Sequence, residues 1–354
     1  MWSDLPEHLK ERVMESLPVD CFFRFRAVCR RWNTLLSSEH FNSIARNSQP
    51  FLILCPFKTQ RPTLIYSFFT HTWRPISLSF IPYVCPLNFG GSASGLLLVD
   101  IQTNPWFART SPVLYVCNPL SKTCLRLPGM ACVRSIMAKT IAPVGAKRDE
   151  YKVMVIGRSI RDMVLLEVYN SASKSWKFAG RIPDVVIKNE SMIYSKGCLF
   201  CMIDGGMMAY NIEQGITTVV AMPTAGAHNV SPRLICCESR VIVVGAIEEN
   251  YSLKGVIMWE VVFHDEKMKN YVWEEIVKMP DSLFDEFRRC SNLGWFQCGG
   301  VGDKICLRAN VSTEMLVYDV SRGSWSRVFN FPADLRYVSM RYLPLEVMPN
   351  TRLS

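Results

Sequence analysis

The hydrophobic pattern of this chain changes character near residue 46. Before that point apolar residues recur at helical spacing: Leu9, Val13 and Leu17 fall at i, i+4 and i+8, with Pro18 placed to end the helix. A second helical stripe is predicted over Phe22, Phe25, Val28, Cys29 and Trp32, and a third short helix over residues 38–45. From Phe51 onwards short apolar runs alternate with turn-forming residues, which is the pattern of β-strands.

This change predicts an α+β multidomain fold. We expect a three-helix domain at residues 1–46, an all-β domain at residues 51–343 and a tail at residues 344–354. About 45 residues rarely fold unaided, and the helical segment carries more apolar side chains than so small an interior can hide. It either caps its own β domain or offers a surface to a partner.

A repeat organises the β segment. Three strands end on a tyrosine and are followed seven residues later by a tryptophan, and two further segments keep the spacing with other residues: Tyr66/Trp73, Tyr169/Trp176, Tyr318/Trp325, Cys117/Cys124 and Tyr210/Thr217. A sixth segment doubles the spacing, Trp259/Trp273. After each second position comes a proline, 40 to 57 residues from the next: Pro82, Pro128, Pro183, Pro223, Pro280 and Pro332.

A period near 50 residues with short strands and Gly-Gly pairs is typical of kelch-like β-propellers. Each four-stranded blade has two apolar faces and must stack on neighbours, so six repeats predict six blades. The first repeat is one strand short, and the run Arg336–Leu343 is predicted to supply it and close the ring. Trp73, Trp176, Trp273 and Trp325 should then bridge strands or blades.

The N-terminal residues resemble the F-box pattern. The positions that carry the resemblance are Leu5, Pro6, Leu9, Val13, Leu17, Pro18, Phe25, Val28, Cys29 and Trp32. The resemblance implies that these residues dock onto a Skp-type adaptor and through it onto a cullin ubiquitin ligase.

The whole chain resembles plant F-box/kelch-repeat proteins. Three stretches are most similar to the UNUSUAL FLORAL ORGANS-like group: residues 79–95, Cys117–Leu120 and Trp273–Pro280. What this resemblance implies is a substrate-recognition subunit of a ubiquitin ligase. A scaffold or transcriptional co-regulator that binds without degradation, and a carbohydrate-binding or oxidising propeller, are the alternatives.

Composition narrows the class of protein. Of 354 residues 49% are hydrophobic and 20% are charged, as in a globular protein. Apolar runs stay well short of the roughly 18 residues of a membrane span, and the start lacks the order of a secretory signal. We therefore expect the nucleus or cytoplasm, no membrane partner, and 14 cysteines present as thiols. The net charge of +9 is scattered, which disfavours nucleic acid binding and favours an acidic partner segment.

The sequence offers few residues that could form a catalytic site. The five histidines are His8, His40, His71, His228 and His264, and they share no spacing with cysteine or aspartate. Cys198 and Cys201 lie three apart in a strand, so they should face opposite sides and hold no zinc. Residues 90–95 are glycine-rich, but they precede a strand and lack the lysine of a phosphate loop, so a tight loop is expected. We expect no enzyme activity, no cofactor and no metal.

Target recognition is expected on loops at one face of the propeller. The irregular candidates are residues 138–150, 158–162 and 281–289. In the last, Phe284 and Phe287 stand beside Arg288 and Arg289, residue types enriched at binding hot spots. The alternative is that both phenylalanines pack inward and cap the propeller.

Overall fold

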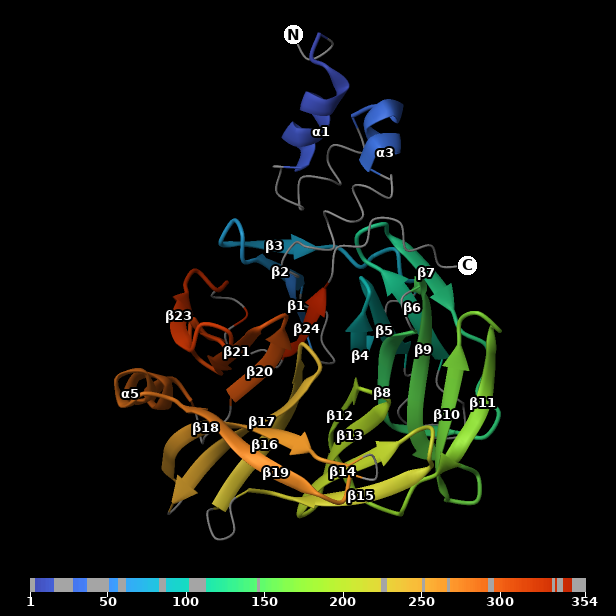
Figure 1. Ribbon diagram of the computed structural model, residues 1–354, viewed down its shortest axis with the longest axis vertical. Helices are drawn as coiled ribbons and strands as arrows, with labels where there is room; N and C mark the ends of the chain where they lie inside the picture. Colours follow the sequence, from blue (N-terminus) through green and yellow to red (C-terminus); the bar gives the residue numbers. More distant parts are fainter. Residues whose placement is uncertain are drawn as a thin grey trace.

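The computed structural model describes residues 4–15, 28–36, 51–56, 62–82, 87–101, 113–144, 147–223, 228–249, 252–265, 268–291, 296–332, 335 and 340–345. Six antiparallel blades of four strands form a ring, and the helices α1 (Glu7–Glu15) and α3 (Arg30–Leu36) lie outside it (Figure 1). Blades 3 and 4 are also joined by a short parallel contact between their innermost strands, Ser191 opposite Lys139. No helix among these residues is long and apolar enough to cross a membrane. The prediction of an N-terminal helical domain followed by a six-bladed propeller is confirmed.

The blades follow one another along the chain. Blade 1 contains β24 (Met340–Leu345), β1 (Phe51–Pro56), β2 (Thr63–Ser67) and β3 (Thr72–Ile76). Blade 2 contains β4 (Leu87–Ala93), β5 (Leu96–Ile101), β6 (Val113–Asn118) and β7 (Thr123–Arg126). Blade 3 contains β8 (Ser135–Val144), β9 (Lys147–Arg158), β10 (Val164–Asn170) and β11 (Ser175–Arg181).

The second half of the ring repeats this order. Blade 4 contains β12 (Ile187–Ser195), β13 (Cys198–Ile203), β14 (Gly206–Asn211) and β15 (Ile216–Ala221). Blade 5 contains β16 (His228–Cys237), β17 (Arg240–Glu249), β18 (Ser252–Phe263) and β19 (Tyr271–Lys278). The helix α5 (Asp281–Cys290) leads to blade 6, which contains β20 (Phe296–Val301), β21 (Lys304–Ala309), β22 (Met315–Asp319) and β23 (Ser324–Val328).

The chain's C-terminal strand closes the ring, as predicted. β24 pairs antiparallel with β1, Phe51 opposite Leu345 and Pro56 opposite Met340. Because blade 1 takes strands from both ends of the β segment, no sheet edge is left open between the last blade and the first. β24 runs to Leu345, so the predicted boundary at residue 343 falls two residues early.

Stacking between blades explains the continuous apolar strands. Every residue of β5 is buried. Leu97 and Val99 face the cluster between blades 1 and 2, whereas Leu96 and Leu98 face the cluster between blades 2 and 3. Since successive side chains of a strand point to opposite faces, a strand enclosed between two neighbours is mostly apolar on both faces. The exception in β5 is Asp100, which pairs with Lys139.

The seven-residue spacing corresponds to the hairpin between the third and fourth strands of a blade. Tyr66 lies opposite Trp73, and the same pairing joins Tyr169/Trp176, Tyr318/Trp325, Cys117/Cys124 and Tyr210/Thr217. The residue five positions after the first member has a positive φ in each of these five hairpins: His71, Lys122, Lys174, Gly215 and Gly323. A common turn geometry therefore sets the spacing. The sixth pair differs, because in the longer hairpin of blade 5 Trp273 lies opposite Val261 and Trp259 lies opposite Glu275.

The outer-strand tryptophans link neighbouring blades. The Nε1 atoms of Trp73, Trp176 and Trp273 donate to the carbonyl oxygens of Phe329, Pro128 and Ala221, each in the preceding blade, at 3.2, 2.8 and 2.8 Å. Trp325 packs on Tyr318 with ring centroids 5.1 Å apart, but its Nε1 has no hydrogen-bond partner among the described residues. In the preceding blade the helix α5 follows β19. The predicted structural role is confirmed for all four.

We expect Trp176→Ala to lower the free energy of unfolding by about 3 kcal/mol, because it removes a packed ring and leaves the Pro128 carbonyl without its donor. For a chain of this size that is a drop of roughly 5 °C in Tm, measurable by thermal unfolding. Phe178→Ala on the same strand is the control, since its ring is 56% exposed and should matter little. Equal midpoints for Trp176→Ala and the unchanged chain would contradict the structural role.

Several local predictions need correction. Val28 and Cys29 lie in a turn and α3 begins at Arg30, so no single helix runs from Val28 to Trp32. Residues 138–150 form most of the β8–β9 hairpin rather than a loop. In the stretch 90–95 only Ser94 and Gly95 form a turn, and the preceding residues continue β4. The predicted helix at 38–45, with Leu17, Pro18, Phe22 and Phe25, lies outside the described residues.

Candidate functional site: two exposed surfaces

The helix α1 presents its apolar residues outward. Leu9 and Val13 are one turn apart and 38% and 42% exposed, whereas Lys10 between them is buried. In an amphipathic helix packed on its own domain, the apolar side chains are buried and the charged side chains are exposed. The outward stripe is therefore a surface suited to an apolar partner.

The remaining described F-box-type positions differ in exposure. Pro6 is exposed and its carbonyl accepts the N–H groups of Leu9 and Lys10 at 3.0 and 3.2 Å, which starts α1, while Leu5 is half-buried. Val28 is 62% exposed, and the Sγ of exposed Cys29 accepts the Trp32 N–H at 3.5 Å. We name Leu5, Pro6, Leu9, Val13, Val28 and Cys29 the helical surface.

Trp32 points the other way. It is half-buried and packs against the apolar cluster between blades 1 and 2. The prediction that Trp32 buries against an adaptor therefore needs correction, because the propeller already covers part of this side chain. Through this contact Trp32 packs α3 against the ring.

The propeller has two distinct faces. The turns between first and second strands and between third and fourth strands gather on one face. In blade 1 the start of β1 lies on this face too, since Phe51 is paired with Leu345 at the end of β24. The described connections between second and third strands, such as 159–163, and between blades, such as 182–186 and 281–291, gather on the other face, which we name the loop face. Two of the three predicted target-binding segments, 158–162 and 281–289, belong to the loop face.

In the segment 281–289 the structure separates the phenylalanines from the arginines. Phe284 and Phe287 are buried in the cluster between blades 5 and 6, where Phe287 meets Phe296 with ring centroids 5.8 Å apart. The prediction that these two side chains contact a target is wrong, because α5 packs its apolar stripe inward. Arg288 and Arg289 stay exposed on the same helix.

Ion pairs and hydrogen bonds fix α5 in place. The N–H groups of Leu283 and Phe284 donate to the Pro280 carbonyl at 3.0 and 2.9 Å, which starts the helix. Arg327 of β23 bonds Glu286 at 2.6 Å and Glu314 at 3.0 Å, joining α5 to the outer strand and a loop of blade 6. The Arg288 guanidinium lies 6.0 Å above the Phe284 ring. Arg288 and Arg289 are thus exposed on a helix that is fixed to blade 6.

Blade 3 contributes exposed apolar residues to the loop face. Ile160, in the β9–β10 loop, is 83% exposed, and Val186 precedes β12. Arg158 pairs with Asp162 at 3.0 Å and Asp184 at 2.8 Å, so it ties the two segments together. Sequence reasoning selected the loop at 158–162 but missed Val186, since one valine between strands gives no signal.

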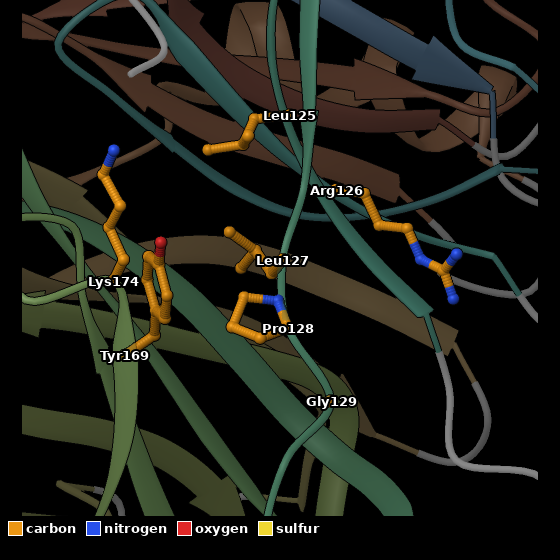
Figure 2. Close-up of a pocket in the computed structure, with 7 residues that line it drawn as sticks. All are labelled: Leu125, Arg126, Leu127, Pro128, Gly129, Tyr169 and Lys174. Atoms are coloured by element: carbon orange, nitrogen blue, oxygen red, sulfur yellow. The ribbon is translucent and has the colours of Figure 1, made fainter.

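A shallow pocket of about 490 Å³ lies on blades 2 and 3 (Figure 2). Its lining is Leu125, Arg126, Leu127, Pro128, Gly129, Tyr169 and Lys174. These residues include no carboxylate, histidine or thiol, and the Pro128 carbonyl is already bonded to Trp176. This set suits contact with another surface better than bond-making chemistry.

The buried and half-buried cysteines on the strands of the other blades, among the described residues, behave as small apolar residues. Cys198 and Cys201 lie in different clusters on opposite sides of β13, as predicted. Burial raises the pKa of the Cys236 thiol to about 11 and those of Cys237 and Cys298 to about 12. Such thiols stay protonated at neutral pH.

Comparison with known proteins adds family relationships. Residues 2–44 match the F-box domain. Over 93% of this chain and 69% of the relative, the sequence is 26% identical to F-box only protein 6 of Arabidopsis thaliana. It is 22% identical to Protein UNUSUAL FLORAL ORGANS of the same plant, over 92% of this chain and 78% of the relative. SKP1-interacting partner 15 is 22% identical over 93% of this chain and 92% of its own length.

Further Arabidopsis relatives are named F-box/kelch-repeat proteins. Among solved structures, a chain of a nidogen/laminin complex matches 83% of this chain and 98% of its own length at 8% identity and a TM-score of 0.49. The F-box match and the six blades together show that this chain carries an F-box domain followed by a β-propeller. The relatives named above are plant proteins.

Proposed function

We propose that this F-box and propeller chain is the substrate-recognition subunit of a Skp–cullin–F-box ubiquitin ligase. The observation that carries the proposal is the F-box match at residues 2–44, joined in this chain to a propeller. Relatives named as F-box or SKP1-interacting proteins align over more than nine-tenths of the chain. One of those relatives is named for its interaction with SKP1. The chain would work without bond chemistry of its own, in the nucleus or cytoplasm.

The helical surface would hold the adaptor. Leu9 and Val13 supply apolar contact area that water now covers, and its burial would drive association. Leu17, Pro18 and Phe25 complete the F-box positions carried over from the sequence. The adaptor would connect the chain to a cullin and its ubiquitin-conjugating enzyme.

The loop face would hold the target. Arg288 and Arg289 stand on a fixed helix and the chain's net charge is +9, so an acidic protein segment is the expected ligand. Binding both the target and the enzyme to one rigid ring raises the effective concentration of target lysines near the conjugating enzyme.

A reconstituted reaction tests this function. Proteins captured by the full-length chain are identified, then incubated with the chain, adaptor, cullin and ubiquitin enzymes. We expect captured targets to gain ubiquitin, and Arg288→Glu/Arg289→Glu to lose most of the capture while retaining the adaptor. Lys196→Glu/Arg322→Glu, a charge reversal in exposed turns of the opposite face, should change neither.

The alternative function gives a different outcome. A scaffold or co-regulator would capture partners that remain unmodified in the complete ligase reaction, although the adaptor is bound. Full capture by the Arg288→Glu/Arg289→Glu variant would instead leave the ligase function standing and move the target site elsewhere on the propeller.

A further inference from the structure

Blade 2 holds two thiols where other blades hold aromatic rings. Cys117 of β6 lies directly opposite Cys124 of β7, at the paired position that carries tyrosine and tryptophan in blades 1, 3 and 6. Their sulfur atoms are 3.0 Å apart. A disulfide bond is about 2.05 Å long, so an approach of about 1 Å separates the two thiols from a bond.

The surroundings of the two cysteines differ in burial and shift the pKa values of their thiols in opposite directions. Cys117 is buried in the cluster between blades 1 and 2, whereas Cys124, on the outer strand, is half-buried. The Cys117 thiol hydrogen-bonds the Cys124 sulfur, which lowers the pKa of Cys124 while this bond and burial raise that of Cys117. Cys124 is therefore the more accessible of the two thiols and the one whose ionisation is favoured, so a dissolved oxidant would react there first.

We propose that Cys117 and Cys124 form a reversible disulfide, with a hydroperoxide as the oxidant. The Cys124 thiolate attacks the peroxide oxygen, the O–O bond breaks, and the products are a Cys124 sulfenic acid and, after protonation, water. The Cys117 sulfur then attacks the Cys124 sulfur, the S–O bond breaks and a second water leaves with the Cys117 proton. In total two thiols are oxidised and one hydrogen peroxide is reduced to two waters.

The backbone needs little rearrangement for this step. The two strands are already in register from Tyr115/Arg126 to Asn118/Thr123, and the turn between them is held by Asn118, whose Oδ1 accepts the N–H groups of Leu120 and Ser121. The crosslink would lock the outer hairpin of blade 2. That hairpin belongs to the cluster against which Trp32 packs.

Peptide mapping of the full-length chain tests the proposal. Trypsin cuts after Arg109, Lys122 and Arg126, so peptides 110–122 and 123–126 separate unless a disulfide joins them. The reduced chain is treated with increasing hydrogen peroxide, then unfolded in denaturant that contains N-ethylmaleimide, so that every remaining thiol is alkylated, and digested. We expect more than half of the chain to yield the joined peptides before half of the exposed Cys29 is oxidised, and dithiothreitol to separate them.

Two controls keep the result specific. Cys198 and Cys201 should stay fully alkylated, since they face opposite sides of β13. In Cys117→Ala, Cys124 should accumulate as a sulfenic acid that dimedone traps. If both blade 2 peptides stay alkylated when half of Cys29 is oxidised, the proposal is wrong. Joined peptides that arise only together with oxidation of Cys198 and Cys201 would overturn it too, since unfolding would then produce them.

Discussion

Replacing Leu9 and Val13 by aspartate should abolish co-purification of the full-length chain with a Skp-type adaptor. Truncating one buried anchor of an interface typically costs about 2 kcal/mol, so losing two predicts binding at least roughly 10³-fold weaker. Charged groups at these positions would also be desolvated on docking. Because both side chains already face solvent, the propeller should keep its thermal midpoint. Titration calorimetry with the purified adaptor measures the loss.

A matched control separates the surface from the chemistry of the substitution. Phe178→Asp/Val272→Asp makes the same kind of change at residues of similar exposure on the outer strands of blades 3 and 5. It should leave adaptor binding intact. Undiminished adaptor affinity in the Leu9→Asp/Val13→Asp variant would exclude α1 from the interface. A Leu5→Ala/Pro6→Ala variant that still co-purified fully would count against the start of the F-box pattern.

Lys139→Met should destabilise the propeller strongly. The Lys139 ammonium lies 2.6 Å from the Asp100 carboxylate, and both side chains are at most 3% exposed. Removing one partner of a buried pair typically costs about 3–5 kcal/mol, because the other charge stays in the interior. For this chain that is a drop of roughly 5–8 °C in Tm, measured by thermal unfolding.

The surface pair Lys188–Asp204 provides the comparison. Its nitrogen–oxygen distance is also 2.6 Å, but its side chains are 50% and 63% exposed. Lys188→Met should therefore cost less than about 1 kcal/mol. Lys139→Met/Asp100→Leu, which removes both buried charges, should recover most of the lost stability. Equal midpoints for Lys139→Met and Lys188→Met would show that burial does not govern this pair.

The local spacing of residues determined the helix α1, the outer hairpins of the blades and the number of blades. The stripe of Leu9 and Val13 predicted α1, and the Tyr66/Trp73 spacing predicted the hairpins and with them the number of blades. These features depend on residues within about ten positions of one another, where turn geometry and helical periodicity act directly. The run Arg336–Leu343 could be assigned to blade 1 because the first repeat lacked a strand, and the structure places that strand at Met340–Leu345.

Only the tertiary structure decided which side of each element meets a neighbour. Phe284 and Phe287 carry the same residue type that marks a binding site, and they turned inward because blades 5 and 6 leave space beneath α5. Lys139 became buried because Gly90, on the adjoining β4, leaves room for it: a Cβ there would lie 2.6 Å from its Cγ. The bonds from Trp73, Trp176 and Trp273 end on the preceding blade, about 50 or more positions away in sequence. Ring closure and blade stacking bring such residues together, and no local pattern encodes distances of that kind.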